Sequence, residues 1–595
     1  MNRDFFKKRF ALLLCLLIAI VMVYASCGAN ESPGGTNLQE ENVDEGDIVK
    51  FSQDGKIFNL QSDGITVTQT HEGGLTLLAR QSQPNFVPVE MFITQTQLVT
   101  IGGLSRTYYE GNSSHSYYRT SYTQAVVNVY DLTGLGEEYS ENALELLYTL
   151  KIEAQFNTSR IYIQTGALYL MFTKSVNRTG SSGDVIGGDG SGLGGISLSY
   201  SENSTQKSLA NITYFKNAIT DGEYMQEQSS ATIFFKIDLN NLEQPAQASA
   251  YYGAKLQTVY ASEHALYPVH TFSLRLKDQQ TQGCMSYTPL NSSTLISKLD
   301  PDTLDLEKSV QLRDLYIYGR HALKDDGTNF YVVASSRKRA DGSAVFVLGA
   351  NMNLVGERRN IAPYEDVKSV RYEQKDGDMF CYIVTFRQTD PLFKVDLSRP
   401  TAPVVTGELE IDGFSTYLHT FAGDRAIGLG LLSNSGRLSD GIKVTLFDTS
   451  GDDPVYLDHM EIYSTADVPA LYNPRAFCVD NQNMIFGFSA LKYAGGSYQQ
   501  GFYIFAVVGE NDDRLADIAY LSNFGQPDTE SYGVAENYYY DKYESFRKFI
   551  NRAFYRGDYA YAVADGQVTS YVVENLIDRS DWTPYQTLDT TRAPE

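Results

Sequence analysis

The sequence predicts an all-β protein, a single large β-propeller of four-stranded antiparallel blades, eight or nine in number. Three observations predict this fold. Short strands of alternating apolar and polar residues dominate the chain and recur as a unit between turns that contain Gly, Asp or Asn. The chain holds 43 Tyr and 30 Phe but one Trp, and Tyr and Phe suit half-buried strands. Before roughly the last hundred residues, no long stretch repeats apolar residues at i, i+3, i+4 and i+7, as an amphipathic helix would.

The repeated unit has two recognisable strands. The first follows a polar or glycine turn, and its copies are GKIFNL near Gly55, TQLVTIGG near Gln97, GALYLMFTK near Gly166, HALYPVH near His264, GTNFYVVAS near Gly327, GDMFCYIVTF near Gly377, GDRAIGLGLL near Gly423, NQNMIFGFSA near Asn481 and GDYAYAVADG near Gly557. The second often ends in Asp and a turn, and its clearest copies are NVYDLTG (128–134), FFKIDLNNL (234–242), LISKLDPDTL (295–304), LFKVDLSRP (392–400) and VTLFDTSGD (444–452).

These units follow one another at an irregular spacing of roughly 40 to 80 residues, as expected for four-stranded blades that carry loop insertions. Each unit alone exposes an apolar sheet face, which packing against neighbours around a ring would bury. We therefore expect one propeller over residues 36–577, with the blade number depending on whether the two chain ends share a blade. The Gly/Ser-rich segment 176–229 is expected to form a long exposed loop inserted into one blade. Residues 578–595 are expected to be a weakly ordered tail.

Residues 1–26 have the three parts of a secretion signal in the required order. A basic start precedes the uncharged, mostly apolar residues 10–24, which are fewer than the about twenty that span a bilayer. The following Ala25-Ser26-Cys27-Gly28 resembles a lipobox, so we predict a lipoprotein signal peptide, a lipid on Cys27 and a flexible tether over 27–35. The domain is then expected in the bacterial cell envelope, periplasmic or surface-exposed. Ordinary secretion, with cleavage near Ala25, and an uncleaved anchor are the alternatives.

The excess of acidic over basic residues argues against some classes of binding partner. Asp and Glu number 72 against 48 Lys and Arg, for a formal net charge of −24. Because such a surface repels polyanions, nucleic acid is not expected as a partner.

Several segments carry a family resemblance. They are TNLQEENVDEGDIVK (36–50), VTFRQTDPLFKVDLSRPTAPVVTGEL (384–409), GFSTYLH (413–419), GIKVTLFDTS (441–450) and RGDYAYAVADGQVTSY (556–571). The chain resembles the secreted β-propeller domain family of bacterial and archaeal envelope proteins, itself distantly similar to WD-type repeats. The resemblance covers nearly all of the chain after the signal, except the Gly/Ser insertion and the tail. It implies the propeller fold and export, and it transfers no catalytic residues because the family has no established reaction.

One group of candidate site residues lies just before the first strand. Asp44, Glu45 and Asp47 put three carboxylates within a short stretch that Lys50 follows. Hard cations such as Ca²⁺ take oxygen ligands, so these three are the weak candidates for a metal site. The alternative is that they cap a turn and pair with Lys50 or with arginines of a neighbouring blade.

Two further groups of polar residues belong to the repeated strands. Arg387, Gln388 and Asp390 lie between two strands and are expected at one face of the ring, where they either lock adjacent blades or bind a ligand. Tyr417 and His419 share one face of a regular strand. These two side chains are expected either to serve simple packing or to have a functional or inter-blade hydrogen-bonding role.

No nucleophile elbow, zinc helix, P-loop or dinucleotide fingerprint occurs in the sequence. The sequence therefore favours an envelope-anchored binding or scaffold module for a protein, peptide or glycan partner. No catalytic residue and no cofactor other than the Ca²⁺ candidate is identified. The alternative is a propeller enzyme of hydrolase or lyase type, acting on an envelope polysaccharide, lactone or peptide, because propeller active sites draw residues from separate blades.

Overall fold

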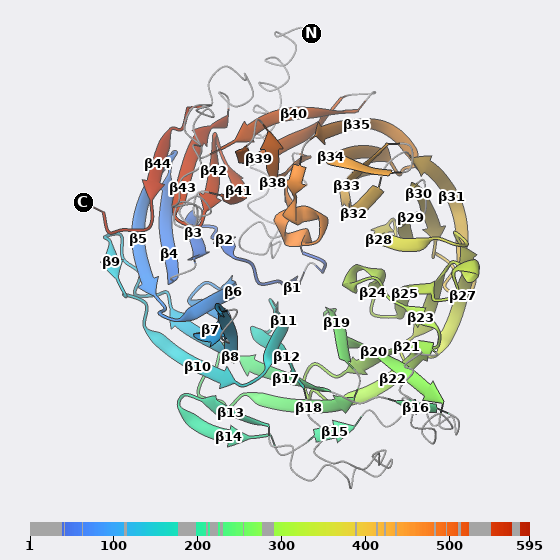
Figure 1. Cartoon of the computed structure of the whole chain (residues 1–595), viewed down its shortest axis with the longest axis horizontal. Helices are drawn as coiled ribbons and strands as arrows, with labels where there is room; N and C mark the ends of the chain where they lie inside the picture. The colour runs from blue at the N-terminus through green and yellow to red at the C-terminus, as the bar shows by residue number, and fades with distance from the viewer. Residues whose placement is uncertain are drawn as a thin grey trace. The chain divides into compact units, whose positions relative to one another are not determined.

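Nine β-sheets follow one another around a ring in the described part of the chain (Figure 1). The computed structural model describes residues 38–40, 42–61, 64–111, 116–175, 198–209, 212–214, 224–226, 230–253, 255–276, 291–386, 390–411, 414–421, 424–434, 437–463, 465–480, 484–494, 497–509, 513–522, 549–573 and 583–594. All of them lie in one compact unit, Pro33–Glu595. The predicted all-β propeller is confirmed, with nine blades. Among these residues no helix is both long and apolar enough to cross a membrane.

The first three blades are built from the N-terminal part of the chain. Blade 1 contains β2 (Val49–Phe51), β3 (Lys56–Gln61), β4 (Gly64–His71), β5 (Gly74–Ser82) and, parallel to β5, β9 (Ser140–Glu141). Blade 2 contains β6 (Phe86–Ile93), β7 (Gln97–Gly111), β8 (Ser116–Asp131), β10 (Leu146–Ile152), β13 (Ser199–Glu202) and β14 (Thr205–Ser208). Blade 3 contains β1 (Val43–Asp44), β11 (Gln155–Tyr162), β12 (Ala167–Ser175), β17 (Ser230–Asp238), β18 (Gln247–Gly253) and β15 (Ile212–Tyr214).

The next three blades continue around the ring in chain order. Blade 4 contains β19 (Lys255–Ala261), β20 (Leu266–Leu276), β21 (Asn291–Leu299), β22 (Leu306–Leu312) and β16 (Tyr224–Gln226). Blade 5 contains β23 (Leu315–Tyr316), β24 (Leu323–Asp325), β25 (Asn329–Ser336), β26 (Ser343–Gly349) and β27 (Leu354–Ile361), with the 3₁₀ turns η3 (Arg320–Ala322) and η4 (Arg339–Asp341). Blade 6 contains β28 (Asp366–Lys375), β29 (Asp378–Phe386), β30 (Asp390–Asp396) and β31 (Val404–Ile411).

The C-terminal part of the chain completes the ring. Blade 7 contains β32 (Phe414–Phe421), β33 (Arg425–Asn434), β34 (Arg437–Asp448) and β35 (Val455–Tyr463). Blade 8 contains β36 (Thr465–Asp467), β37 (Cys478–Asp480), β38 (Ile485–Ala494), β39 (Ser497–Val508) and β40 (Arg514–Leu521), with η5 (Pro469–Leu471) and η6 (Pro474–Ala476). Blade 9 contains β41 (Ile550–Arg556), β42 (Tyr559–Ala564), β43 (Gln567–Val572) and β44 (Gln586–Asp589).

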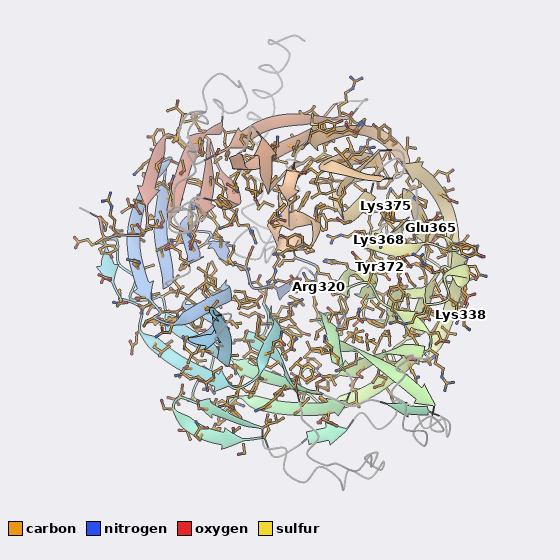
Figure 2. The ribbon with its side chains drawn as sticks, in the orientation of Figure 1. Arg320, Lys338, Glu365, Lys368, Tyr372 and Lys375 are labelled. Atoms are coloured by element: carbon orange, nitrogen blue, oxygen red, sulfur yellow. The ribbon has the colours of Figure 1, made fainter. Side chains whose placement is uncertain are left out.

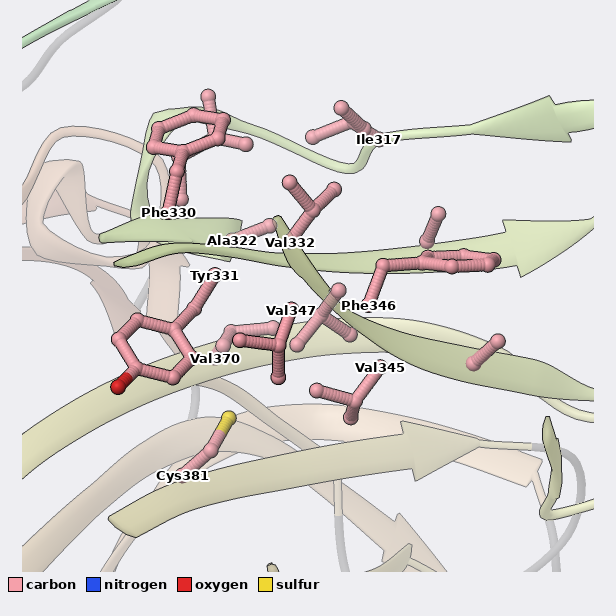
Figure 3. Packing of buried hydrophobic residues seen from close by; sticks show 14 of the residues in the cluster. Ile317, Ala322, Phe330, Tyr331, Val332, Val345, Phe346, Val347, Val370 and Cys381 are labelled. Atoms are coloured by element: carbon pink, nitrogen blue, oxygen red, sulfur yellow. The ribbon is translucent and has the colours of Figure 1, made fainter. Parts of the chain in front are cut away.

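Apolar side chains fill the space between neighbouring blades. Figure 3 shows this packing where Val345 and Val347 of blade 5 face Val370 and Cys381 of blade 6, all of them buried. Since each blade has a neighbour on both sides, a middle strand such as β26 is buried along nearly its whole length. This double burial explains why a middle strand such as β26 reads as a nearly continuous apolar run in the sequence rather than as an alternating one.

The Gly/Ser-rich insertion leaves blade 3 between β12 and β17, and its described part differs from the exposed loop that we predicted over 176–229. Residues 198–209 form the β13–β14 hairpin, which extends blade 2 by pairing with β10. Leu198 and Tyr200 are buried, and the Tyr200 ring packs against Phe235 of blade 3 at a centroid distance of 5.0 Å. The short alternation of these two apolar residues with serines is what makes this part of the insertion a strand.

The C-terminal segment also differs from the prediction, because residues 578–595 were expected to form a weakly ordered tail. Instead β44 pairs with β43 as the outer strand of blade 9. The Gln586 side chain bonds to both backbone polar groups of Leu75, and the Gln61 amide donates to Thr590 Oγ1 at 2.7 Å. The sequence QTLD is polar and half-exposed, so it gives no apolar alternation to signal a strand. These bonds close the ring without any blade shared between the two chain ends.

Candidate functional site

The residues just before blade 1 lie in the centre of the ring (Figure 1). We call residues 38–48, of which 41 is not described, the central segment. Within it, β1 pairs antiparallel with the inner edge of β11 in blade 3. Asp47 exchanges backbone hydrogen bonds with Met91 of blade 2, and the Gln39 amide donates to the carbonyl of Arg320 in blade 5 at 3.0 Å. The central segment therefore ties the neighbouring blades 2 and 3 to blade 5, which is not next to blade 2 or blade 3 in the ring.

Glu40 of the central segment pairs with Lys324 of blade 5 at 2.7 Å, and the other three described carboxylates of the segment each pair with a cation from a different blade. The pairs are Asp44–Lys50 of blade 1 at 2.8 Å, Glu45–Arg320 of blade 5 at 2.5 Å, and Asp47–Arg552 of blade 9 at 2.6 Å. Within the described residues, no three His, Cys, Asp or Glu side chains are grouped as metal ligands. Because the neighbouring cations would repel Ca²⁺, this arrangement suits ion pairing between blades better than a metal site.

Two more arginines join these pairs. Arg475 of blade 8 pairs with Glu90 of blade 2 at 2.7 Å and also donates to the Gly46 carbonyl. Arg160 of blade 3 lies 3.8 Å from Glu45, beyond hydrogen-bond distance, and donates instead to neighbouring oxygens of its own strand. We call the nine side chains the central charge cluster: Asp44, Glu45, Asp47, Lys50, Glu90, Arg160, Arg320, Arg475 and Arg552.

The pKa values of Glu45, Arg475 and Arg160 are shifted in different directions by burial and by the neighbouring charges. Burial alone would raise the pKa of Glu45, but Arg320 and Arg160 hold it well below its usual range. For Arg475 the effect of burial is outweighed by Glu90 and Glu45, so its pKa is raised. Burial, with repulsion from Arg320 and Arg475, lowers the pKa of Arg160 to about 10 despite the attraction of Glu45 and Glu90. Arg160 is thus still charged at neutral pH, and among the described residues no carboxylate lies within hydrogen-bond distance of it.

A pocket of about 250 Å³ lies beside this cluster. It is lined by Asn157, Thr158, Arg160, Leu256, Gln257, Thr258, Val259, Arg320, Tyr472, Asn473, Pro474 and Arg475, which come from blades 3, 4, 5 and 8. Among the described lining residues there are three arginines and no carboxylate. Tyr472 is 69% exposed, and its hydroxyl donates to Asp467 at 3.0 Å. The pocket therefore presents mostly hydrogen-bond donors, together with one exposed aromatic ring.

Arg320 and Arg475 reach the centre because the innermost strands of blades 5 and 8 are interrupted. In blade 5, η3 separates β23 from β24, and in blade 8, η5 and η6 separate β36 from β37. Proline cannot donate to a strand ladder, so Pro469 and Pro474 stop the inner strand of blade 8. The Asn473 side chain then accepts from the Arg475 backbone and caps η6. Figure 2 shows Arg320 on the inner side of the ring, far from Lys338 at the rim.

Strand register shows on which side of the ring the pocket lies. Thr158 pairs with Met171 of β12, and the end of β12 at Ser175 pairs with the start of β17 at Ser230. The Gly/Ser-rich insertion therefore leaves blade 3 from the end nearer the pocket. In blade 4, Leu256 pairs with His270 of β20, which runs on toward the connection at 277–290. We call this side the pocket face, since the longest connections of both blades leave from it.

The family model described as Beta propeller domain matches residues 34–576, from before the central segment to the end of β43. The chain belongs to the beta propeller domain family. This membership confirms the β-propeller part of the resemblance noted in the sequence, and the export that the resemblance implied stays a prediction. The match of the beta propeller domain includes the central segment, so the segment is part of the family's domain rather than a leader attached to it.

Two relatives from archaea are similar to parts of this beta propeller domain. An uncharacterised protein of Archaeoglobus fulgidus is 35% identical over 161 residues, which cover 27% of this chain and 24% of the relative. An uncharacterised protein of Methanocaldococcus jannaschii is 32% identical over 180 residues, which cover 30% of this chain and 26% of the relative. The matched region thus spans about a quarter of each relative.

Tyr417 and His419 lie between blades 7 and 8 of the propeller rather than in the pocket. Both are buried, and the Tyr417 hydroxyl lies 3.2 Å from His419 Nδ1. Their rings pack on Phe477 at centroid distances of 5.0 and 5.4 Å. Because Phe477 directly follows η6, this packing supports the turn that carries Arg475.

The remaining predicted site residues fall outside what the structure describes. Cys27, Arg387 and Gln388 lie outside the described residues, and for Asp390 only the backbone, at the start of β30, is described. The roles predicted for these four residues stay predictions.

Sequence reasoning missed the residues that define the pocket. Arg160, Arg320 and Arg475 stand far apart in the chain, and no local motif joins them. The one signal near any of them is the Asn473-Pro474-Arg475 turn, because a proline inside a strand region marks an interruption. A propeller brings such isolated residues together only when the ring closes.

Proposed function

We propose that this chain is an envelope-anchored binding module that holds a glycan, peptide or protein partner at the pocket face. The observation that carries the proposal is the pocket itself, which four blades line at the centre of the ring. Ligand sites are concave and place a small number of polar groups among the blades or loops that frame them. The fold alone cannot carry this function, because propellers host many activities.

The chemistry of the pocket favours binding over the hydrolase or lyase alternative. Glycoside hydrolysis requires two carboxyl groups roughly 5 to 9.5 Å apart around the reacting bond. The described lining has no Asp, Glu, His, Ser or Cys. The nearby carboxylates of Glu45 and Glu90 are each engaged by an arginine. Apart from the Tyr472 phenol, a partner at this site meets donors that hold it rather than groups that transfer a proton.

Replacing Tyr472 with alanine is expected to weaken ligand binding on the order of tenfold, since exposed aromatic side chains at a site often dominate its affinity. The measurement is binding of the signal-free chain to a panel of immobilised envelope glycans and peptides. Tyr463→Ala is the matched control, because Tyr463 is 61% exposed and lies on the outer strand of blade 7. Equal binding by both variants and the unaltered chain would place the ligand elsewhere.

The anchor requires its own test, because Cys27 lies outside the described residues. Lipid chains contribute about 0.8 kcal/mol per buried CH₂ group, so a lipidated Cys27 would hold the chain stably on a membrane. Cys27→Ser is therefore expected to move the protein from the membrane fraction to the soluble fraction of its host. Metabolic labelling with a fatty acid should mark the natural chain and not the variant. Labelling of both would rule out Cys27 as the acceptor.

A further inference from the structure

The central charge cluster contains one more cation than carboxylate. Its four carboxylates are taken up by four cations in the pairs Asp44–Lys50, Glu45–Arg320, Asp47–Arg552 and Glu90–Arg475. Arg160 is the fifth cation, and its only carboxylate contact among the described residues is the 3.8 Å approach to Glu45. Its side chain is 4% exposed. A buried charge without a full counter-charge is unfavourable, so the described residues of the site are short of one negative charge.

We propose that the pocket binds the carboxylate of an acidic sugar, a uronate unit, which supplies the counter-charge that Arg160 lacks. This inference rests on the proposed function and names the ligand class of the same site. A single added negative charge would bring the nine-residue cluster to neutrality. The proposal therefore concerns one acidic unit rather than a polyanion, which the net charge of −24 would repel.

The donor chemistry of the pocket fits a carboxylate. A guanidinium presents planar N–H groups that match a carboxylate, as Arg320 does in its two contacts with Glu45 at 2.5 and 2.6 Å. The side-chain oxygens of Asn157 and Asn473 already accept from Thr173 and from the Arg475 backbone. Their amide NH₂ groups remain as donors among the described residues, so the lining offers few acceptors to a cationic or donor-rich ligand.

Pocket size and Tyr472 favour a sugar over a peptide as the source of the carboxylate. Pockets for drug-sized ligands occupy about 300 to 1,000 Å³, and this pocket of about 250 Å³ suits one compact unit. The exposed ring of Tyr472 offers an apolar face with a polar tip, on which the face of a pyranose can lie. The amides of Asn157 and Asn473 match the hydroxyl oxygens that surround a sugar carboxylate.

The first experiment compares probes that differ only at the carboxyl group. D-glucuronate is expected to bind the signal-free chain and to raise its melting temperature, while glucose and the methyl ester of glucuronate bind at least tenfold more weakly. Binding of glucuronate is expected to weaken as salt is added. Equal binding of the ester and the acid would overturn the carboxylate assignment. Stronger binding of a short acidic peptide than of glucuronate would overturn the sugar assignment, and neither result would affect the proposed binding function.

The second experiment applies one substitution to two arginines of the same cluster. Arg160→Gln is expected to leave the urea midpoint unchanged or higher, because each carboxylate keeps its partner, and to lower glucuronate affinity at least tenfold. Arg552→Gln is expected to lower the urea midpoint, because it leaves Asp47 buried without a cation. An equal loss of stability in both variants would overturn the inference that Arg160 is the surplus charge. If instead Tyr472→Ala left all ligand binding unchanged, the proposed function itself would fail.

Discussion

A chain that begins at Ile48 is expected to lose the cooperative unfolding of the ring, whereas a chain that begins at Leu38 is expected to keep it. The shorter chain lacks the partners of Lys50, Arg320 and Arg552, which then lie buried and unpaired. Removing one partner of a buried ion pair costs about 3–5 kcal/mol. The three losses are coupled and do not simply add, so we expect a total destabilisation above about 5 kcal/mol.

Urea denaturation followed by circular dichroism tests this expectation on the two truncated chains, each begun with an added Met. The chain that begins at Leu38 is the matched control, since it lacks everything before the central segment and keeps all its contacts. Coincident urea midpoints for the two chains would mean that the central segment contributes little to the stability of the ring.

Glu45→Gln is expected to be the most damaging single substitution in the central charge cluster, lowering the free energy of unfolding by about 3–5 kcal/mol. Glutamine preserves the size of the side chain but removes the charge that Arg320 and Arg160 share. Adding Arg320→Gln to this variant should restore part of the loss, because one of the uncompensated cations is then also removed. A double-mutant cycle measured by urea unfolding gives the coupling between the two residues. A double variant less stable than the sum of the single effects would contradict this assignment.

The stability difference between the unaltered chain and the Glu45→Gln variant is also expected to depend on pH. Because the folded-state pKa of Glu45 lies below its ordinary value of 4.5, the unfolded chain takes up the proton first as pH falls. The contribution of Glu45 is thus complete above about pH 4.5 and is lost progressively below it. The difference in stability between the unaltered chain and Glu45→Gln should therefore be largest near neutral pH and should narrow in acid. A difference that stayed constant down to pH 3 would argue against the ion pair as its cause.

Most of the fold could be predicted because the middle strands of the blades carry clear sequence signals, namely apolar residues and a turn residue at the strand end. In β30, for example, Leu392 and Val395 are buried, and the strand ends in the Asp396 that marks the repeated unit. Strands at the outer edge give much weaker signals. The polar β44 and the short β13–β14 hairpin, which lies on the outer side of blade 2, were both missed, because strands on the outer side of a blade bury only part of one face and so need few apolar residues.

The candidate site could be predicted only where its partners are close in sequence. The carboxylates at Asp44, Glu45 and Asp47 stand out from the sequence, and Lys50 lies near enough to be considered as a partner. Arg320 and Arg552 lie 275 and 505 residues from the carboxylates they bind. Only the closed ring brings these residues together. A single sequence contains no motif from which a pair so far apart in the chain could be predicted.

The contacts of the central segment also constrain the order in which the ring can be completed during synthesis. Its residues are made early, yet Asp47 can pair with Arg552 only after a further 505 residues have been made. Contacts between such distant residues form slowly, because the entropy cost of closing a long loop comes before the contacts can stabilise the chain. The Asp47–Arg552 ion pair is therefore available only after the first strand of blade 9 has been made, so the centre of the ring can be completed only near the end of synthesis.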